Sequence, residues 1–76
     1  MNKQRRKDIQ RAYDLIVEAK DVIDTCLEEE QECYDNLPEG IQASERGEEM
    51  ENNVGQLQEC SDNLDYATDA LEEFIY

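Results

Sequence analysis

The chain has 76 residues and a formal net charge of -14 at pH 7, with 21 acidic side chains, 7 basic ones and no histidine. This length fits one domain, residues 1–76, and the core of so short a chain is small. The charge argues against direct binding to nucleic acid or to an anionic membrane, and no apolar run is long enough to span a bilayer.

The start of the chain is its only basic segment. Five of the seven basic side chains lie there: Lys3, Arg5, Arg6, Lys7 and Arg11. Basic residues at a helix start oppose the helix dipole, so another interaction must favour them. In an antiparallel helix pair they would lie beside Asp69, Glu72 and Glu73, and we interpret them as exposed ion pairs, which are weak. The alternative is a small basic site that binds a phosphate or an acidic partner.

A first helix is expected over about residues 3–36. Mostly apolar residues repeat every seven positions. A small residue stands three positions after each of the first four of them. This is the pattern of a helix packed along one seam. The repeating positions are Ile9, Ile16, Ile23, Glu30 and Leu37, and the small residues are Ala12, Ala19, Cys26 and Cys33.

Helix-breaking residues predict a turn over residues 37–44. Pro38 disfavours helical dihedrals at the residue before it, so the first helix is expected to stop near Asn36. Gly40 suits the left-handed conformation that ends a helical turn. Ser44 is expected to cap the next helix, its hydroxyl accepting a hydrogen bond from a backbone N–H.

A second helix is expected over about residues 45–75. Glu45, Glu48 and Glu49 place negative charge at its positive end, which stabilises the helix. It carries the same kind of seam as the first helix. The repeating positions are Met50, Leu57, Leu64 and Leu71, with Asn53, Cys60, Ala67 and Phe74.

Large residues of one helix match small residues of the other when the paired residue numbers sum to 83. Six of the eight layers are of this kind, such as Ile16 with Ala67, and this alternation permits close packing. The polar layer of Glu30 and Asn53 is either a hydrogen bond that penalises slipped registers or a locally hydrated defect. The sequence predicts an all-α fold, a two-helix antiparallel coiled-coil hairpin.

Further apolar residues lie beside this seam. Leu15 and Val22 occupy one flank. The other flank is an apolar edge formed by Tyr13, Leu27, Tyr34 and Val54. Because one facing helix cannot cover so wide a stripe, we expect the hairpin to form a homodimeric four-helix bundle. Two alternatives stay open: the edge only shields the seam, or it binds a different protein.

Acidic residues line the outer faces of both helices. They recur at intervals of seven at Asp14, Asp21, Glu28, Asp35, Asp62 and Asp69. Such rows usually serve solubility. Here the charge imbalance exceeds that need, and repulsion among carboxylates costs stability. We therefore interpret the rows as a candidate partner-binding face that competes for Lys- and Arg-lined grooves, where nucleic acid normally binds.

The composition argues against an enzyme. Without histidine there is no imidazole base, no Ser-His or Cys-His pair and no His-containing zinc site. No glycine-rich phosphate loop is present. Consecutive side chains of a helix point in different directions around its axis, so the carboxylates of Glu28, Glu29 and Glu30 make a poor cation site. We expect no catalytic residue, no cofactor and no metal.

The three cysteines are interpreted as packing residues. Cys26, Cys33 and Cys60 have no C-x-x-C spacing, are odd in number and all fall on the expected seam. This usage indicates a reducing cytoplasm, although a disulfide between Cys26 and Cys60 under oxidising conditions stays open. No signal peptide is predicted, because the basic start is followed by a polar, amphipathic segment.

The sequence resembles small acidic helical proteins encoded in phages and prophages of Gram-positive bacteria. The likeness is carried by NKQRRKDIQRAYDLI at the start, by NLPEGIQASERGEEMENNVGQLQEC over residues 36–60 and by the ending NLDYATDALEEFIY. Gly47 and Gly55 depart from it, and Gly47 is interpreted as making room for Tyr34. The group has no assigned activity, so the resemblance implies the helical hairpin, a phage context and the cytoplasm of a bacterial host.

Two functions follow as hypotheses. The first is a non-enzymatic inhibitor of a bacterial host or defence protein that binds nucleic acid, such as a CRISPR-type protein, through acidic rows that mimic nucleic acid. This hypothesis rests partly on analogy, since small acidic phage proteins are commonly inhibitors of host machinery. The second is a structural coiled-coil adaptor whose charge serves only solubility.

Overall fold

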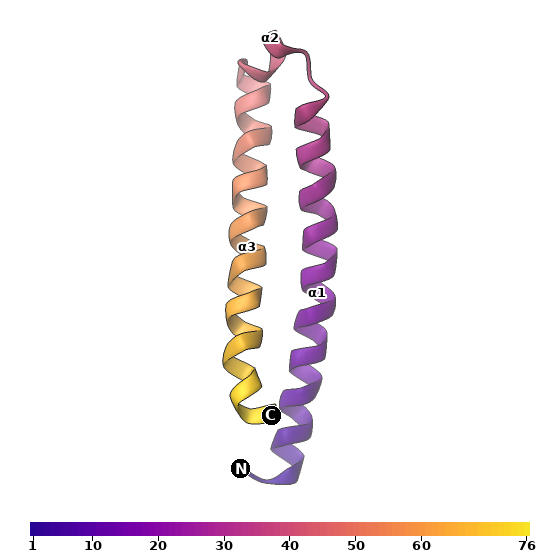
Figure 1. The fold of residues 1–76 in the computed structure, drawn as a ribbon, viewed down its shortest axis with the longest axis vertical. Helices are drawn as coiled ribbons and strands as arrows, with labels where there is room; N and C mark the ends of the chain where they lie inside the picture. The colour runs from indigo at the N-terminus through magenta and orange to yellow at the C-terminus, as the bar shows by residue number, and fades with distance from the viewer.

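The structure is a computed structural model that describes residues 1–76, and it is all-helical. Helix α1 spans Lys3–Asp35, α2 spans Glu39–Gln42 and α3 spans Glu45–Ile75. The two long helices lie side by side and run in opposite directions, with α2 at the end where the chain reverses (Figure 1). The result is a rod with extents of 58 × 15 × 14 Å. The predicted all-α class is confirmed.

Polar residues define both ends of α1. Asn2 precedes the helix, and its side-chain oxygen accepts a hydrogen bond from the Arg5 backbone N–H at 2.8 Å. This satisfies one of the unpaired donors of the first turn. At the other end the Asn36 N–H donates to the Glu32 carbonyl at 3.0 Å. Pro38 then prevents further helix, as its effect on the preceding residue predicts.

The connection between the long helices contains the short helix α2 within the predicted turn 37–44. Gly40 lies inside α2 and has no positive φ, so its predicted left-handed role is wrong. Ser44 directly precedes α3, as expected of a cap, but its hydroxyl donates to the Ile41 carbonyl and accepts nothing from α3.

Gly47 is the position where the connection touches α3 most closely. A Cβ at this buried residue would lie 2.1 Å from the Gln42 carbonyl oxygen. Gly47 therefore makes room for the Gln42 backbone and not for the Tyr34 side chain, which corrects the interpretation from sequence. The Gln42 side-chain amide in turn donates to the Tyr34 carbonyl at 3.0 Å, which ties the connection to the end of α1. Beyond this point α3 continues unbroken through Gly55.

Helix α1 turns a different set of residues towards α3 than the one expected. The predicted small-residue positions, Ala12, Ala19, Cys26 and Cys33, are all exposed, so their assignment to the seam is wrong. The isoleucines are half-buried as expected, but the residues four positions later share the seam with them. The half-buried seam positions are Ile9, Tyr13, Ile16, Lys20, Ile23, Leu27, Glu30, Tyr34 and Leu37.

The residues of α3 that face α1 also differ from the expected set. Asn53, Cys60 and Phe74 are exposed, while Gly47, Ser61 and Thr68 are the most buried residues of the chain. The seam positions of α3 are Gly47, Met50, Val54, Leu57, Ser61, Leu64, Thr68, Leu71 and Ile75. Three of these nine positions, Gly47, Ser61 and Thr68, carry small residues that let α1 approach closely. The larger side chains of Tyr13, Leu27 and Tyr34 then bury more apolar area than alanine or cysteine would.

The pairing of the two helices follows from three contacts between side chains. Tyr13 contacts Glu72, Lys20 contacts Asp65, and Asp24 contacts Ser61. The residue numbers of each pair sum to 85, two more than the 83 expected. No hydrophobic side chain is buried. A lone helix pair therefore has a seam but no enclosed core, which is marginal for stability.

Candidate functional site

One face of the helix pair is crossed by polar contacts, and we call it the acidic face. The Tyr13 hydroxyl donates to Glu72 at 3.0 Å, and the Lys20 ammonium lies 3.7 Å from the Asp65 carboxylate. The Ser61 hydroxyl donates to the Asp24 carboxylate. Tyr13 and Lys20 are seven residues apart and Asp24 follows after four, so all three lie on one side of α1.

The six predicted partner-binding acids lie along the outer edges of this face. Each directly follows a seam residue in the chain, as Asp14 follows Tyr13 and Asp62 follows Ser61. A single step in a helix turns the side chain by about 100°, from the seam to the outer edge. All six are exposed: Asp14, Asp21, Glu28, Asp35, Asp62 and Asp69. The structure thus brings the rows of both helices to the same side of the rod.

Glutamine side chains hold half of these acids in place. The amide of Gln10 donates to Asp14 at 3.0 Å, that of Gln31 to Asp35 at 2.9 Å, and that of Gln58 to Asp62 at 3.0 Å. Each donor lies four residues before its acceptor, on the same face of its helix, and such pairs stabilise a helix modestly. The sequence interpretation missed these pairs, although the repeated Gln-x-x-x-Asp spacing signals them.

Lys20 and Asp24 form an ion pair on the acidic face. Their ion pair measures 2.7 Å, and Lys20 also reaches towards Asp65 of α3. The hydrogen bond to Asp24 raises the pKa of the Lys20 ammonium above its usual value. Hydrogen bonds from Lys20 and Ser61 lower the pKa of the Asp24 carboxyl. Both groups stay charged at neutral pH, so a cation sits between the acidic rows and links the two helices.

The apolar edge predicted as an interface lies between the acidic rows. Tyr13, Leu27, Tyr34 and Val54 are half-buried, since they pack at the boundary of α1 and α3. The Tyr13 hydroxyl is additionally held by Glu72, and this hydrogen bond raises the pKa of the phenol. These side chains serve the packing within the chain and keep only part of their surface for a partner.

The basic segment extends past the end of α3. Because Tyr13 lies beside Glu72, the residues before Ile9 have no neighbour from α3, and α1 projects beyond the C-terminus (Figure 1). The ion pairs expected between this segment and Asp69, Glu72 and Glu73 are absent, because both salt bridges of the chain involve Lys20. The interpretation as ion pairing is wrong for this reason. Lys3, Arg5, Arg6, Lys7 and Arg11 are exposed.

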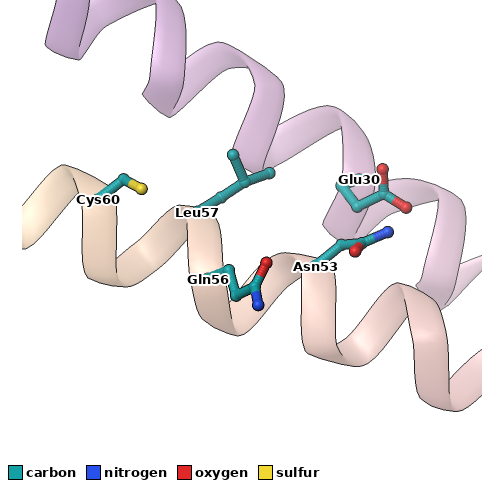
Figure 2. A pocket seen from close by; sticks show the side chains of 5 residues that line it. All are labelled: Glu30, Asn53, Gln56, Leu57 and Cys60. Atoms are coloured by element: carbon teal, nitrogen blue, oxygen red, sulfur yellow. The ribbon is translucent and has the colours of Figure 1, made fainter.

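An open hollow of about 280 Å³ lies on the other face of the pair. Glu30, Asn53, Gln56, Leu57 and Cys60 line it (Figure 2). Glu30 and Asn53 come close to each other there, but no hydrogen bond joins them, so of the two interpretations the hydrogen bond is wrong. The hollow is lined by one carboxylate and one thiol, and no basic side chain is present there to activate the thiol, which gives it no evident chemistry.

The chain shows no cluster of three side chains positioned to bind a metal ion. None of its helices combines the length and apolar character needed to cross a membrane. Comparison with protein-family models, curated proteins and solved structures found no match. The acidic face is therefore the candidate functional surface on the strength of its own charge and geometry.

Proposed function

We propose that this protein is a non-enzymatic inhibitor that binds a bacterial host or defence protein, of the CRISPR type or another kind, at its nucleic-acid groove. The observation that supports it most directly is the alignment of the acidic rows of α1 and α3 on one face of a stiff rod. Its target is a protein groove lined by Lys and Arg. Attraction between such surfaces is long-ranged at low salt and falls as salt rises.

The spacing of the charges suits this role. Seven residues of helix rise about 10.5 Å, close to three nucleotide steps of about 3.4 Å along one strand. The partly exposed Tyr34 and Leu27 between the rows offer an apolar contact within the acidic surface. The phage context and the bacterial cytoplasm remain part of the proposal through the sequence resemblance.

The proposed functional form is a homodimer of the antiparallel coiled-coil hairpin, a four-helix bundle. Since no hydrophobic side chain is buried in one chain, a second copy would supply the missing core. The acidic rows of both copies would then remain outside. Sedimentation at several loading concentrations distinguishes a monomer from a dimer, because the dimer population depends on concentration.

Affinity capture from bacterial lysate tests the inhibitor proposal. The chain is immobilised, and bound proteins are identified at low and at moderate salt, with and without added DNA or RNA. We expect nucleic-acid-binding proteins whose capture falls sharply with salt and is competed by nucleic acid. A partner that binds equally at both salt concentrations, together with its nucleic acid, would contradict mimicry.

A matched pair of variants shows whether the rows themselves bind. The row variant carries Asp14→Asn, Asp21→Asn, Glu28→Gln and Asp35→Asn. The control carries Glu18→Gln, Glu32→Gln, Glu59→Gln and Glu73→Gln, which removes the same charge from exposed positions outside the rows. We expect capture to be lost in the row variant and largely kept in the control. Equal losses would mean that only net charge matters.

The alternative function is a structural adaptor, and the exposed apolar residues on the face opposite the acidic rows favour it. These include Leu15, Val22 and Phe74, which are 54%, 59% and 47% exposed. An adaptor would keep its partners in the row variant. It would lose them when Leu27→Asp or Tyr34→Asp disturbs the packing of the helices.

A further inference from the structure

The face opposite the acidic face is apolar mainly over the middle of the rod, and we call it the apolar face. The same rows also place polar residues on it, chiefly towards its two ends: Asp8, Glu29, Asn53, Gln56 and Asn63. Residues three positions after the seam isoleucines turn towards it, whereas those four positions after turn towards the acidic face. The hollow confirms this orientation, since Cys60 and Leu57 line it together with Glu30 of α1 (Figure 2). The exposed residues of the face are Ala12, Leu15, Ala19, Val22, Cys26 and Cys33 of α1, and Cys60, Ala70 and Phe74 of α3.

Half-buried side chains run along the middle of this face. Ile16 and Ile23 of α1 and Leu57, Leu64 and Leu71 of α3 are each covered on one side by the opposite helix and open on the other. Large and small residues therefore alternate across the face, as they do inside helical bundles. Its carboxylates, Asp8, Glu29 and Glu30, lie towards its two ends. Two such faces can approach each other although each chain carries a net charge of -14.

The size of the face fits a second copy of the chain. Extents of 58 Å by 15 Å give a projected area of about 870 Å². Stable protein interfaces bury about 800 Å² per partner. The apolar middle of the face and its polar ends match such interfaces, which have an apolar core and a polar rim. A self-complementary contact related by a two-fold axis is the commonest way for identical chains to cover such a face.

The two ends of the rod differ in charge, since basic residues project from one end past Glu72 and Glu73 and the other end is acidic. One end holds the basic segment, which extends past α3 and forms no ion pair. The other end holds Glu39, Glu45, Glu48 and Glu49, with Arg46 as its one basic residue. If the two-fold axis ran along the rod, like charges would meet at both ends. If the axis is perpendicular to the rod, each basic segment lies beside the acidic turn of the second copy.

We infer that two copies pack apolar face against apolar face in opposite directions, with the two-fold axis perpendicular to the rod. The inference rests on the proposed homodimer and adds to it the interface and its direction. In this bundle the isoleucines, leucines and cysteines of both copies form the core. Each basic segment compensates the acidic turn of its partner, and this gives the N-terminal charges of the chain a role.

A distance measurement between spin labels tests the direction. The label is attached to Gln4→Cys in a chain that also carries Cys26→Ala, Cys33→Ala and Cys60→Ala, which keep the face apolar. In the proposed dimer the two labels sit at opposite ends, separated by about the rod length of 58 Å. In a dimer whose axis runs along the rod they lie within about 20 Å, roughly two helix diameters. The short distance would overturn the inference.

A second label position serves as the control. Glu18→Cys in the same background lies near the middle of the rod, so its label pair is much closer together than the Gln4 pair in the proposed dimer. Sedimentation of the labelled chains must show a dimer, and a folded monomer at the same concentration would also overturn the inference. These outcomes are separate from lysate capture, which tests the inhibitor proposal and does not depend on label distances.

Neutralising the acidic turn gives an independent test. A variant with Glu39→Gln, Glu45→Gln, Glu48→Gln and Glu49→Gln has four fewer negative charges than the parent net charge of -14, which by itself would tighten a dimer of two acidic chains. The inference predicts the opposite, a weaker dimer with its Kd raised on the order of tenfold. The control with Glu18→Gln, Glu32→Gln, Glu59→Gln and Glu73→Gln should dimerise as well as the parent chain or better. Tightening in the turn variant, with unchanged helix content, would rule out the proposed direction.

Discussion

The Ser61 hydroxyl of α3 donates a hydrogen bond to the Asp24 carboxylate of α1, and this contact lies on the opposite face of the rod from Cys60. Ser61 is among the few buried residues, so the contact marks the side on which the helices approach most closely. The two faces of the rod also differ in their chemical character. Carboxylates gather on its side, and aliphatic side chains and thiols gather on the other.

Replacing Asp24 should change how the stability of the protein depends on pH in the acidic range. Hydrogen bonds from Lys20 and Ser61 lower the pKa of Asp24 from its ordinary value of 3.8. A lowered folded pKa contributes stability that is present above 3.8 and is lost as pH falls through the folded value. We expect Asp24→Asn to be less stable than the parent chain near neutral pH, with a difference that shrinks below about pH 4. Urea unfolding at fixed protein concentration measures it. Asp21→Asn, an exposed neighbour with the same charge change, is the matched control.

Tyr13→Phe should change how the stability of the protein depends on pH in the alkaline range. The hydrogen bond to Glu72 raises the pKa of the Tyr13 phenol from its ordinary value of 10.0. A raised folded pKa contributes stability that is complete below 10.0 and is lost as pH rises through the folded value. The variant should therefore be less stable than the parent chain at pH 8, and the two should converge above about pH 10. Thermal unfolding followed by circular dichroism tests this. Tyr66→Phe, at a residue that is 79% exposed, is the matched control.

The two glycines of α3 should respond in opposite ways to alanine. A Cβ at Gly47 would lie 2.1 Å from the Gln42 carbonyl oxygen, and backbone cannot move aside as a flexible side chain can. We expect Gly47→Ala to lower the free energy of unfolding by about 1–3 kcal/mol. Nothing lies within 4 Å of a Cβ at Gly55, which sits in an exposed helix interior. Gly55→Ala should raise stability by about 0.5–1 kcal/mol. Denaturant titration gives both values, and equal effects would contradict the close approach at Gly47.

Thiol reactivity should report on the apolar face. Cys26, Cys33 and Cys60 are free and exposed in the single chain. A dimer packed through the apolar face would cover them, so their reaction with a thiol reagent should slow as protein concentration rises. The rate is followed from nanomolar to high micromolar concentration, with a fourth thiol at Glu73→Cys as the exposed reference. Rates that stay equal to the reference at all concentrations would contradict burial of this face.

Much of the architecture can be predicted from the sequence, because it depends on local chemistry. The heptad spacing indicates two long helices, Pro38 ends the first, and Ser44 precedes the second. The intervals of seven also place the six acids on exposed edges of their helices. These features depend on residues near in the chain, whose backbone preferences and periodicity can be read directly.

The side of each helix that forms the seam was decided by the tertiary structure. In α1 the isoleucines are flanked by two candidate rows, the small residues that include Ala19 and Cys26 and the larger ones that include Tyr13 and Leu27. The larger row packs against α3 because Gly47, Ser61 and Thr68 leave space for it. Sequence periodicity gives both rows nearly the same weight, since they differ by one position in seven. Only the contact between the helices shows which row the other helix can cover, and therefore which face is left for a partner.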